Sequence, residues 1–334
     1  MGKLKVVHFG LAHDHSTATM ECARKYPDIF EVAGIVEPDE SIRKQFGSAP
    51  AYKGIPWLSE EELFRRSDID AVFCEGHELR SVSDAQKCID NGLHVHLDKP
   101  GGICYPSFER LVNDADRKGL TLQMGYMYRY NPAMEYTLEQ VKNGKLGRIT
   151  GIDGSFSICH DLYKRRWLKQ FPGGMMFFLG CHIIDMIHLL NGVPDAVLSL
   201  NRSSELDNDG SLDTGFAVLE YPHGVCSVRV NATEVNGYSR RHLVVCGSKG
   251  TIEIRPLEGP TRLRETPASE IRSHQLVDAG YELFPGYLAG RYDKMMLEFA
   301  QCVSGEKKNP YLPEYELDVQ KSVMQACGIC LTQA

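Results

Sequence analysis

Residues 5–15, KVVHFGLAHDH, join a short apolar run to a loop that holds one glycine and two histidines. Lys5–Phe9 is typical of a buried strand, and Thr17–Lys25 has the pattern of a helix. A strand, a glycine-containing turn and a helix in this order open the dinucleotide-binding βαβ fold, in which a pyrophosphate meets the helix N-terminus. We therefore expect the intervening loop to bind a cofactor through Gly10, Leu11, Ala12, His13, Asp14 and His15.

The loop departs from the usual G-x-G-x-x-G pattern. Gly10 is retained, Ala12 is a small substitute, and His15 is a bulky one. Glu37 ends the second predicted strand, 22 residues after His15. An acid at this distance binds the ribose hydroxyls of NAD and repels the 2′-phosphate of NADP. The sequence therefore favours NAD over NADP, unless Glu37 only belongs to a polar turn.

The two histidines of the loop raise the alternative of a metal site. On an extended strand, His13 and His15 would share one side, but in a loop their rings can splay apart. The nearby sequence offers no obvious third ligand. Capping of the next helix by Asp14 or Ser16 is a simpler explanation. We therefore predict no metal.

Strand and helix alternate through the first third of the chain, and the pattern then changes. Apolar strands are expected at 5–9, 31–36, 70–74, 94–97 and 120–124. Helices between them indicate a doubly wound parallel sheet. After Gly125, an apolar helix at 174–191 is followed by successive strands, which indicate an antiparallel sheet. We expect an α/β fold with a Rossmann domain at 1–124 and an α+β domain for substrate binding and oligomerisation at 125–334. The last helices, 292–303 and 314–331, are candidates to pack back on the first domain.

Composition narrows the class of protein. The 334 residues are 43% hydrophobic and 24% charged, with a formal net charge of −7. This acidic balance argues against a nucleic-acid or anionic-membrane partner, and no run of about 18 apolar residues predicts a membrane span. The N-terminus lacks the apolar region of a signal peptide. The eleven cysteines are odd in number and often lie in apolar runs, so we expect reduced thiols and a cytoplasmic location.

Four motifs occur in an order that resembles the Gfo/Idh/MocA family, named after glucose–fructose oxidoreductase, inositol dehydrogenase and rhizopine catabolism. HVHLDKP at 94–100 resembles the E-K-P motif of the family. GYMYRYNP at 125–132 resembles its G-F-x-Y-R-F-N-P segment. Gly173-Gly174 followed by GCHIID at 180–185 resembles its G-G…D-x-G-x-H-x-x-D segment, and GSKGT at 247–251 resembles the turn in its second sheet.

The resemblance implies a Rossmann domain, a second domain with a large, mostly antiparallel sheet, and a homo-oligomer, a dimer or tetramer, formed through that sheet. It implies that NAD(P) oxidises or reduces a sugar, cyclitol or related polyol. Lys99 would lie beside the nicotinamide and the reacting hydroxyl, and His182 would act as the general base or its partner. A histidine can accept the hydroxyl proton near neutral pH, and a cation stabilises the developing alkoxide. Asp185, three residues after His182 on a helix, is a candidate to bind a sugar hydroxyl.

Three departures from the family pattern stand out. Phe178 replaces the aspartate four residues before the histidine, so a proton relay through that position is absent. Asp98 replaces the glutamate of E-K-P and preserves its charge. The loop EGHELRS at 75–81 replaces T-P-x-x-x-H, which lies against the nicotinamide half in the family. Glu75, Gly76 and His77, with Asp98 and Tyr126, are candidate cofactor contacts, although a solvated loop is an alternative.

The region that borders the substrate in the family contains further candidates. Trp167 offers a face for a sugar ring, and His160 and Arg166 offer hydrogen bonds to hydroxyls. In the alternative interpretation, the tryptophan is core and the arginine is surface. Tyr126, Tyr128 and Tyr130 alternate, so an extended backbone would direct all three to one side. We take Tyr128 as a substrate contact, with core packing as its alternative.

Three functions remain open from sequence. The first is an NAD-dependent dehydrogenase of a sugar, glycoside or cyclitol. The second is a redox-neutral enzyme that retains NAD and oxidises a sugar carbon transiently, permitting elimination or glycoside cleavage; Phe178 and the altered loop motivate it. The third is a non-catalytic regulator that binds NAD or a sugar, since fold alone does not exclude one.

Overall fold

The computed structural model describes residues 2–258, 261–268, 281–283 and 290–331. The chain divides into two units, each described here by itself. Unit 1 consists of Met1–Met127 and Ala289–Leu317, and unit 2 of Tyr128–Leu288 and Asp318–Ala334. The boundary at 127/128 lies close to the expected cut at 124/125, and the segment that includes 292–303, a candidate to pack back on the first domain, belongs to unit 1. Within the described residues, no helix is long and apolar enough to cross a membrane.

Unit 1 contains a six-stranded sheet, all parallel, in the order β3-β2-β1-β4-β5-β6. The strands are β1 (Leu4–Phe9), β2 (Phe30–Val36), β3 (Trp57–Leu58), β4 (Ala71–Cys74), β5 (His94–Leu97) and β6 (Leu122–Met124). All four residues of β4 are buried, as expected for a central strand covered on both faces. The strand order reverses between β1 and β4, which is where open α/β sheets bind ligands.

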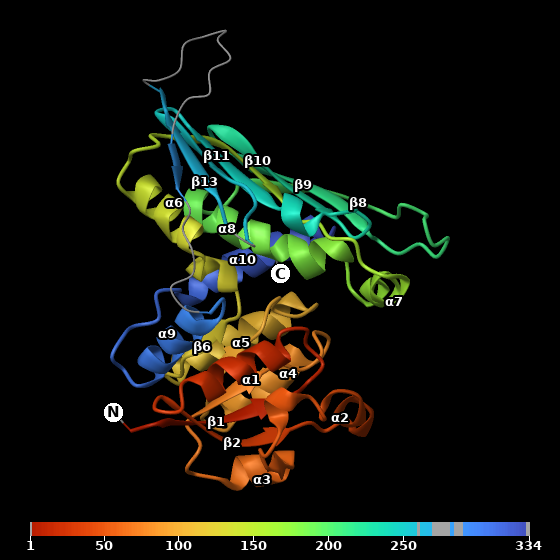
Figure 1. Cartoon of the computed structure of the whole chain (residues 1–334), viewed down its shortest axis with the longest axis vertical. Helices are drawn as coiled ribbons and strands as arrows, with labels where there is room; N and C mark the ends of the chain where they lie inside the picture. Colours follow the sequence, from red (N-terminus) through yellow and green to blue (C-terminus); the bar gives the residue numbers. More distant parts are fainter. Residues whose placement is uncertain (1, 259–260, 269–280, 284–289, 332–334) are drawn as a thin grey trace. The chain divides into compact units, whose positions relative to one another are not determined.

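Helices cover both faces of this sheet (Figure 1). They are α1 (Ser16–Lys25), α2 (Glu40–Phe46), α3 (Glu60–Arg65), α4 (Ser81–Asp90), α5 (Tyr105–Arg117) and α9 (Asp293–Val303). α9 belongs here because Asp293 accepts hydrogen bonds from Lys25 and Tyr26. The ring of Phe299 also packs 6.0 Å from that of Phe73. Charge pairing and an aromatic contact thus hold a distant segment against the Rossmann sheet.

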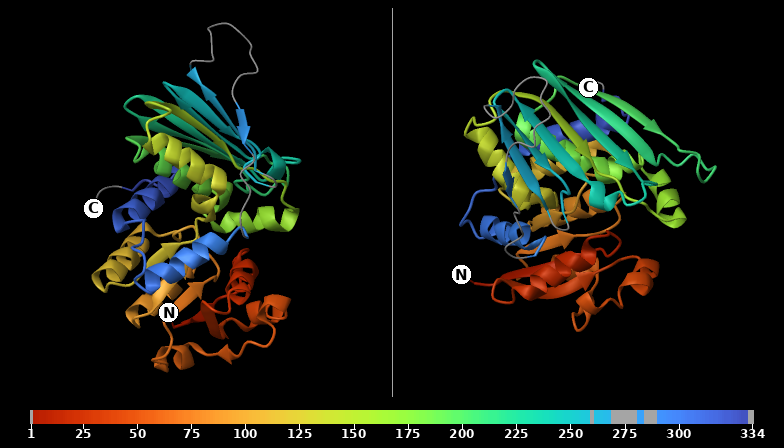
Figure 2. Two further views of the ribbon diagram at one scale, coloured as in Figure 1. Left: turned by 60° about the vertical axis from the view of Figure 1, so that its left-hand side comes forward. Right: turned by 45° about the horizontal axis from the view of Figure 1, so that its top comes forward.

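Unit 2 contains an eight-stranded sheet in the order β14-β13-β12-β11-β7-β10-β9-β8, in which only the β7–β10 pair is parallel. Helices α6 (Pro132–Lys142) and α8 (Cys181–Asn191) lie on the same side of it (Figures 1 and 2). Helix α10 (Pro313–Ala326) begins in unit 1 and ends in unit 2. The strands are β7 (Ile149–Ser155), β8 (Ala196–Arg202), β9 (Thr214–Tyr221), β10 (Gly224–Asn231), β11 (His242–Gly247), β12 (Gly250–Ile254), β13 (Leu263–Pro267) and β14 (Tyr281–Leu283). The predicted fold class is confirmed.

Two local features of unit 2 refine the expectations from sequence. The expected apolar helix at 174–191 is helical to Asn191, but it begins as a π-helix, η4 (Met176–Gly180), that continues into α8. The backbone around the three tyrosines is not extended but forms a 3₁₀ turn, η2 (Met127–Tyr130). Apolar composition does not distinguish hydrogen bonds to i−4 from those to i−5, and π turns often occur at functional sites. The short helix α7 (Leu162–Trp167) was not predicted at all.

We predict that acid destabilises unit 2 through His188 of α8, whose Nε2 lies 2.9 Å from Ser322 Oγ. Burial, and then the charge of Arg129, lower the pKa of His188 from 6.5 to about 4. The unfolded chain therefore binds this proton more readily, so the stability is full above about pH 6.5 and is lost as pH falls toward 4. By about pH 4.5 the loss reaches about 2–3 kcal/mol. The free energy of unfolding in urea, measured at neutral and acid pH, should fall less on acidification in His188→Gln than in the parent. Equal falls in the two proteins would contradict this assignment.

Candidate active site

The loop after β1 makes close backbone contact with the loop after β4. Gly10 has a φ of +89°, and a Cβ there would lie 2.3 Å from the Cα of Gly76. Only glycine meets both constraints. The one glycine retained from the dinucleotide pattern therefore closes the turn against the Glu75–Gly76 segment.

Glu37 holds this loop from the end of β2. Its Oε2 accepts the N–H of Leu11 at 2.8 Å, and its Oε1 accepts the N–H of Asp39 at 3.0 Å. Burial raises the pKa of Glu37, and the backbone hydrogen bonds oppose that shift. The carboxylate is thus fixed between the loop and β2, and is not simply part of a solvated turn.

The start of α1 does not show the capping by Asp14 or Ser16 that the sequence suggested. The N-cap residue is His15, and no side chain caps it by a hydrogen bond. Ser16 instead shares hydrogen bonds with Tyr52 and His8 inside unit 1. The first turn of α1 carries no acidic residue, which leaves the positive end of the helix dipole compatible with an anion.

Five side chains form what we call the histidine–carboxylate cluster: His13, His15, Glu75, Glu78 and Asp98. Asp98 Oδ2 lies 2.9 Å from His15 Nδ1 and 3.2 Å from His13 Nδ1. Glu75 Oε2 is 3.6 Å from His13 Nδ1, and Glu78 Oε1 is 3.7 Å from His13 Nε2. The centroids of the two rings lie 4.8 Å apart, and a third group faces them. The nearby sequence offers no such group, because Asp98 follows β5, 83 residues from His15.

Burial and charge compete within the cluster. Burial lowers the pKa of His15 to about 4. Burial would also lower the pKa of His13, but Asp98 and Glu78 outweigh it and raise that pKa. Burial and then the charge of Asp98 raise the pKa of Glu75 well above its usual range. For Asp98 itself, burial is outweighed by the two histidines, which hold its pKa well below the usual range.

Several predicted cofactor contacts therefore point into the protein. The side chains of His13, Glu75 and Asp98 are 0–3% exposed and face one another, while that of His15 is 15% exposed. His77 faces outward, with its Nδ1 accepting the N–H of Leu79. In the loop after β1, the backbone, the exposed Asp14 and the part-exposed His15 are the groups that remain accessible.

Lys99 follows the cluster directly, at the carboxyl end of β5. Its side chain is among the most buried of unit 1, at 1% exposure for the residue. The N–H of Lys99 donates to Asp98 Oδ1 at 2.7 Å, and its carbonyl accepts from His13 Nε2 at 3.1 Å. The main chain of Lys99 is therefore fixed from both sides.

In unit 2, His182 occupies the first turn of α8, directly after the π-helix. Its ring is buried between Tyr128 and Phe156, at centroid separations of 5.0 and 5.3 Å. The hydroxyl of Tyr128 donates to Glu258, whose Oε1 lies 3.3 Å from Arg241 Nη1. Sequence reasoning missed Arg241 and Glu258, because neither belongs to a recognised motif. They fix the tyrosine that packs against the histidine.

Asp185 has a partner that the sequence interpretation did not anticipate. Its carboxylate accepts two hydrogen bonds from Arg129, at 3.0 Å from Nε and 2.7 Å from Nη2. Both side chains are almost completely buried. The expectation that Asp185 binds a sugar hydroxyl is replaced by a structural ion pair that ties α8 to η2.

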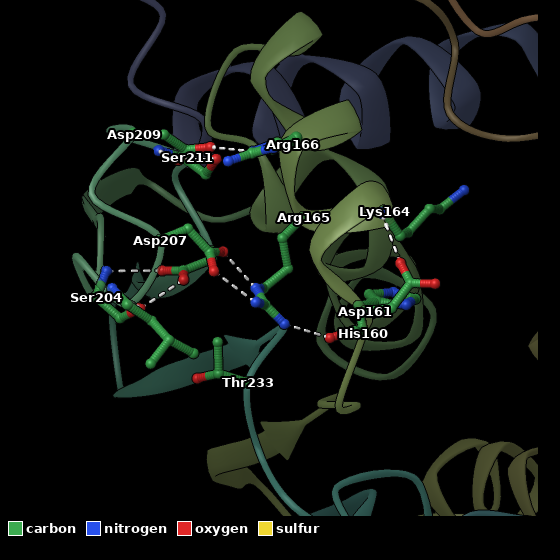
Figure 3. A network of polar contacts seen from close by, with 12 residues as sticks. His160, Asp161, Lys164, Arg165, Arg166, Ser204, Asp207, Asp209, Ser211 and Thr233 are labelled. Carbon is green, nitrogen blue, oxygen red and sulfur yellow. Dashed lines mark hydrogen bonds and ion pairs between the residues drawn. The ribbon is translucent and has the colours of Figure 1, made fainter.

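The candidates near the substrate separate into two groups. Trp167 and His160 both pack against Phe178, at 5.2 and 6.1 Å between centroids, so the residue that replaces the family aspartate forms an aromatic wall with them. Arg166 instead faces Asp209 at 3.3 Å and is exposed. The neighbouring Arg165 forms two 2.6 Å hydrogen bonds to Asp207 and also donates to the carbonyl of His160 (Figure 3). Both arginines thus fasten α7 to the loop between β8 and β9.

Comparison with known proteins agrees with this architecture. Residues 138–323 match the family model described as "Oxidoreductase family, C-terminal alpha/beta domain". The bovine trans-1,2-dihydrobenzene-1,2-diol dehydrogenase is 25% identical, over 91% of this chain and 90% of that enzyme, and the mouse enzyme is matched over 65% of its length. A D-xylose 1-dehydrogenase (NADP⁺) of Haloferax volcanii is 26% identical, over 58% of this chain and 59% of the enzyme.

A solved structure shows the same fold along the whole chain. The 3-ketoreductase KijD10 of Actinomadura kijaniata, in complex with TDP-benzene and NADP, superposes with a TM-score of 0.75 at 19% identity, over 97% of this chain and 96% of that chain. The matching family model describes an oxidoreductase domain, and these curated relatives are named dehydrogenases. The chain belongs to the Gfo/Idh/MocA family.

Proposed function

We propose that this chain transfers a hydride between NAD and a secondary hydroxyl of a sugar, glycoside or cyclitol. The observation that carries the proposal is the buried Lys99, fixed at the carboxyl end of β5 in a Rossmann sheet. Named relatives support it, since they include a dihydrodiol dehydrogenase and a xylose dehydrogenase.

The residues present fit a dinucleotide at three points. The turn at Gly10 has no room for a Cβ, α1 begins directly after the loop without an acidic first turn, and Glu37 stands at the end of β2. When bound, NAD supplies a nicotinamide that accepts or gives the hydride. The chain would hold it by the loop backbone, the N-terminus of α1 and Glu37.

The chain's own residues supply proton and charge chemistry. His182 is a general base for the hydroxyl proton, held in orientation by the rings of Tyr128 and Phe156. Lys99 provides the cation that stabilises the developing alkoxide. The aromatic wall of Trp167, His160 and Phe178 suits the apolar face of a sugar ring. Because Phe178 cannot relay a proton, no proton relay through position 178 assists this base.

A panel of polyols, sugars and glycosides tests the proposal. Purified chain is incubated with each compound and NAD or NADP, and both reduced cofactor and sugar product are measured. Stoichiometric NADH with an oxidised sugar supports a dehydrogenase. Converted sugar without net NADH would establish the redox-neutral alternative instead, and dinucleotide binding without turnover of any compound would favour the regulator.

We predict that Glu37→Ser relaxes the preference for NAD. Glu37 places a negative charge at the end of β2, where it would repel the 2′-phosphate of NADP. Replacing it removes that repulsion together with the hydrogen bond from Leu11, so NADP affinity should rise while NAD affinity falls. Dissociation constants for both cofactors can be measured by fluorescence titration. Unchanged NADP affinity would refute the assignment, and Glu40→Ser on exposed α2 is the matched control.

The open face of the unit 2 sheet supports a proposed homo-oligomer. Leu198 lies opposite Val218, and Leu200 opposite Phe216, on the β8–β9 edge. Leu198 and Leu200 are 55% and 54% exposed. Contiguous exposed apolar side chains mark association surfaces. A dimer or tetramer in sedimentation, converted to smaller species by Leu200→Glu, is the expected result.

A further inference from the structure

We propose that His13, His15 and Asp98 bind one divalent transition-metal ion, with Glu75 as an additional ligand, beneath the loop that follows β1. This inference goes beyond the proposed hydride transfer and does not depend on it. The site would lie within unit 1, where the loops after β1, β4 and β5 meet.

The donor atoms already have the spacing of a coordination sphere. Ligand atoms bonded at about 2.0–2.2 Å to one tetrahedral ion lie about 3.3–3.6 Å from one another. Asp98 Oδ2 is 2.9 Å and 3.2 Å from the Nδ1 atoms of His15 and His13. One ligand atom from each of these three residues lies within 4.8 Å of the others. Glu75 Oε2 is 3.6 Å from His13 Nδ1, so small side-chain shifts suffice to surround an ion.

The tautomer of His13 also suits a ligand. A carbonyl oxygen only accepts, so the 3.1 Å contact with Lys99 places the proton on His13 Nε2. In a neutral ring this leaves a lone pair on Nδ1, which faces Asp98 Oδ2 at 3.2 Å and accepts the backbone N–H of His15 at 3.2 Å. Metal-bound histidines commonly donate their second N–H to a backbone carbonyl in this way. A metal ion between His13 and Asp98 would take the Nδ1 lone pair in place of the His15 N–H.

Three buried carboxyl groups around His13 favour a cation. Glu75 and Glu78 are 0% and 2% exposed, and their carboxylate oxygens face His13 at 3.6 and 3.7 Å. Asp98 faces the same ring at 3.2 Å. Buried carboxylates are costly unless they are paired or coordinate a metal. A divalent ion at Asp98 would offset the negative charge of these groups when they are ionised.

The donor set defines the class of ion. Two imidazoles with one or two carboxylates suit Zn²⁺, Mn²⁺ or Fe²⁺, whereas Ca²⁺ and Mg²⁺ take oxygen ligands. His15 is the most exposed of the ligands, at 15% for its side chain, and gives the ion its route to solvent. A bound ion would tie three loops at the carboxyl edge of the sheet.

Cobalt provides the test, because its visible spectrum reports ligand type. The full chain is treated with chelator and titrated with Co²⁺, without dinucleotide or sugar, and the bound metal is counted. We expect one Co²⁺ per chain, with visible bands and no sulfur-to-cobalt charge transfer. His15→Ala and Asp98→Asn should each weaken binding by at least about 100-fold, the effect that even outer-shell losses can reach. His94→Gln, on the same β5 but outside the cluster, should bind as the parent does.

The outcomes separate clearly. Absence of a stoichiometric site, or equal Co²⁺ affinity in the parent and His15→Ala, would overturn the proposal. A sulfur charge-transfer band would place the ion on cysteines and overturn it as well. If Asp98→Asn does not fold, the part-exposed His15→Ala decides alone. Because no substrate is present, a failed substrate panel would leave this result unaffected, and the reverse also holds.

Discussion

Replacing Lys99 by methionine is expected to lower kcat by about 10²–10³-fold with the best substrate of the panel, the size of effect seen when one charge stabiliser is removed. Methionine retains most of the aliphatic stem, which matters because residue 99 is only 1% exposed. The lost interaction would act on the developing alkoxide, so kcat and kcat/KM should fall together. Initial rates of NADH formation measure both.

The control must separate catalysis from folding, because Lys99 lies beside buried carboxylates. The main-chain contacts of Lys99 with His13 and Asp98 do not use its side chain, so they can persist in the variant. Lys99→Arg retains the positive charge. Its unfolding midpoint should stay close to that of the parent, while its kcat should fall. Dinucleotide affinity and the unfolding midpoint are measured for all three proteins. Turnover that survives in a folded Lys99→Met would remove Lys99 from the proposed machinery.

The Rossmann half was predictable because its signals are local. Apolar strands, helix patterns and the turn at Gly10 each occupy few residues, and their order alone defines a parallel sheet. The position of Glu37 at the end of β2 could be predicted from its distance of 22 residues after His15. Its hydrogen bond with Leu11 could not be predicted, because that contact joins two loops that only the folded structure brings together.

The histidine–carboxylate cluster illustrates what sequence spacing cannot supply. His13 and His15 are two residues apart in the chain, but Glu75 and Asp98 reach them only because β4 lies beside β1 and β5 beside β4. In a doubly wound sheet that adjacency is regular, so the ends of all three strands should have been considered together. The loop after β1 by itself therefore leaves open whether its two rings face each other, and the ends of β4 and β5 decide it.

Unit 2 shows a different limit. The apolar run at 174–191 correctly predicted burial, but its composition is the same for a π turn and an α turn. The partner of Asp185 was hidden for another reason. Arg129 lies within a recognised motif, but a motif match does not say which residue it contacts. The structure shows that Arg129 binds Asp185, the carboxylate of the GCHIID segment.

Removing the buried carboxylate of Asp185 is expected to destabilise the fold by about 3–5 kcal/mol, because it leaves the Arg129 guanidinium buried without this partner. The measurement is the free energy of unfolding of Asp185→Ala in urea at neutral pH. Asp153→Ala is the matched control, since Asp153 is 62% exposed and pairs with His242 at the surface; its loss should stay below about 1 kcal/mol.

A double variant distinguishes the ion pair from a sugar contact. Arg129→Met combined with Asp185→Leu removes both charges while filling similar volume, so most of the lost stability should return. If Asp185 instead served the substrate, Asp185→Ala would raise KM with little change in the free energy of unfolding, and the double variant would restore nothing. The two side chains are almost fully buried and joined by more than one hydrogen bond, so a stability effect larger than that of any exposed pair in unit 2 is the expected result.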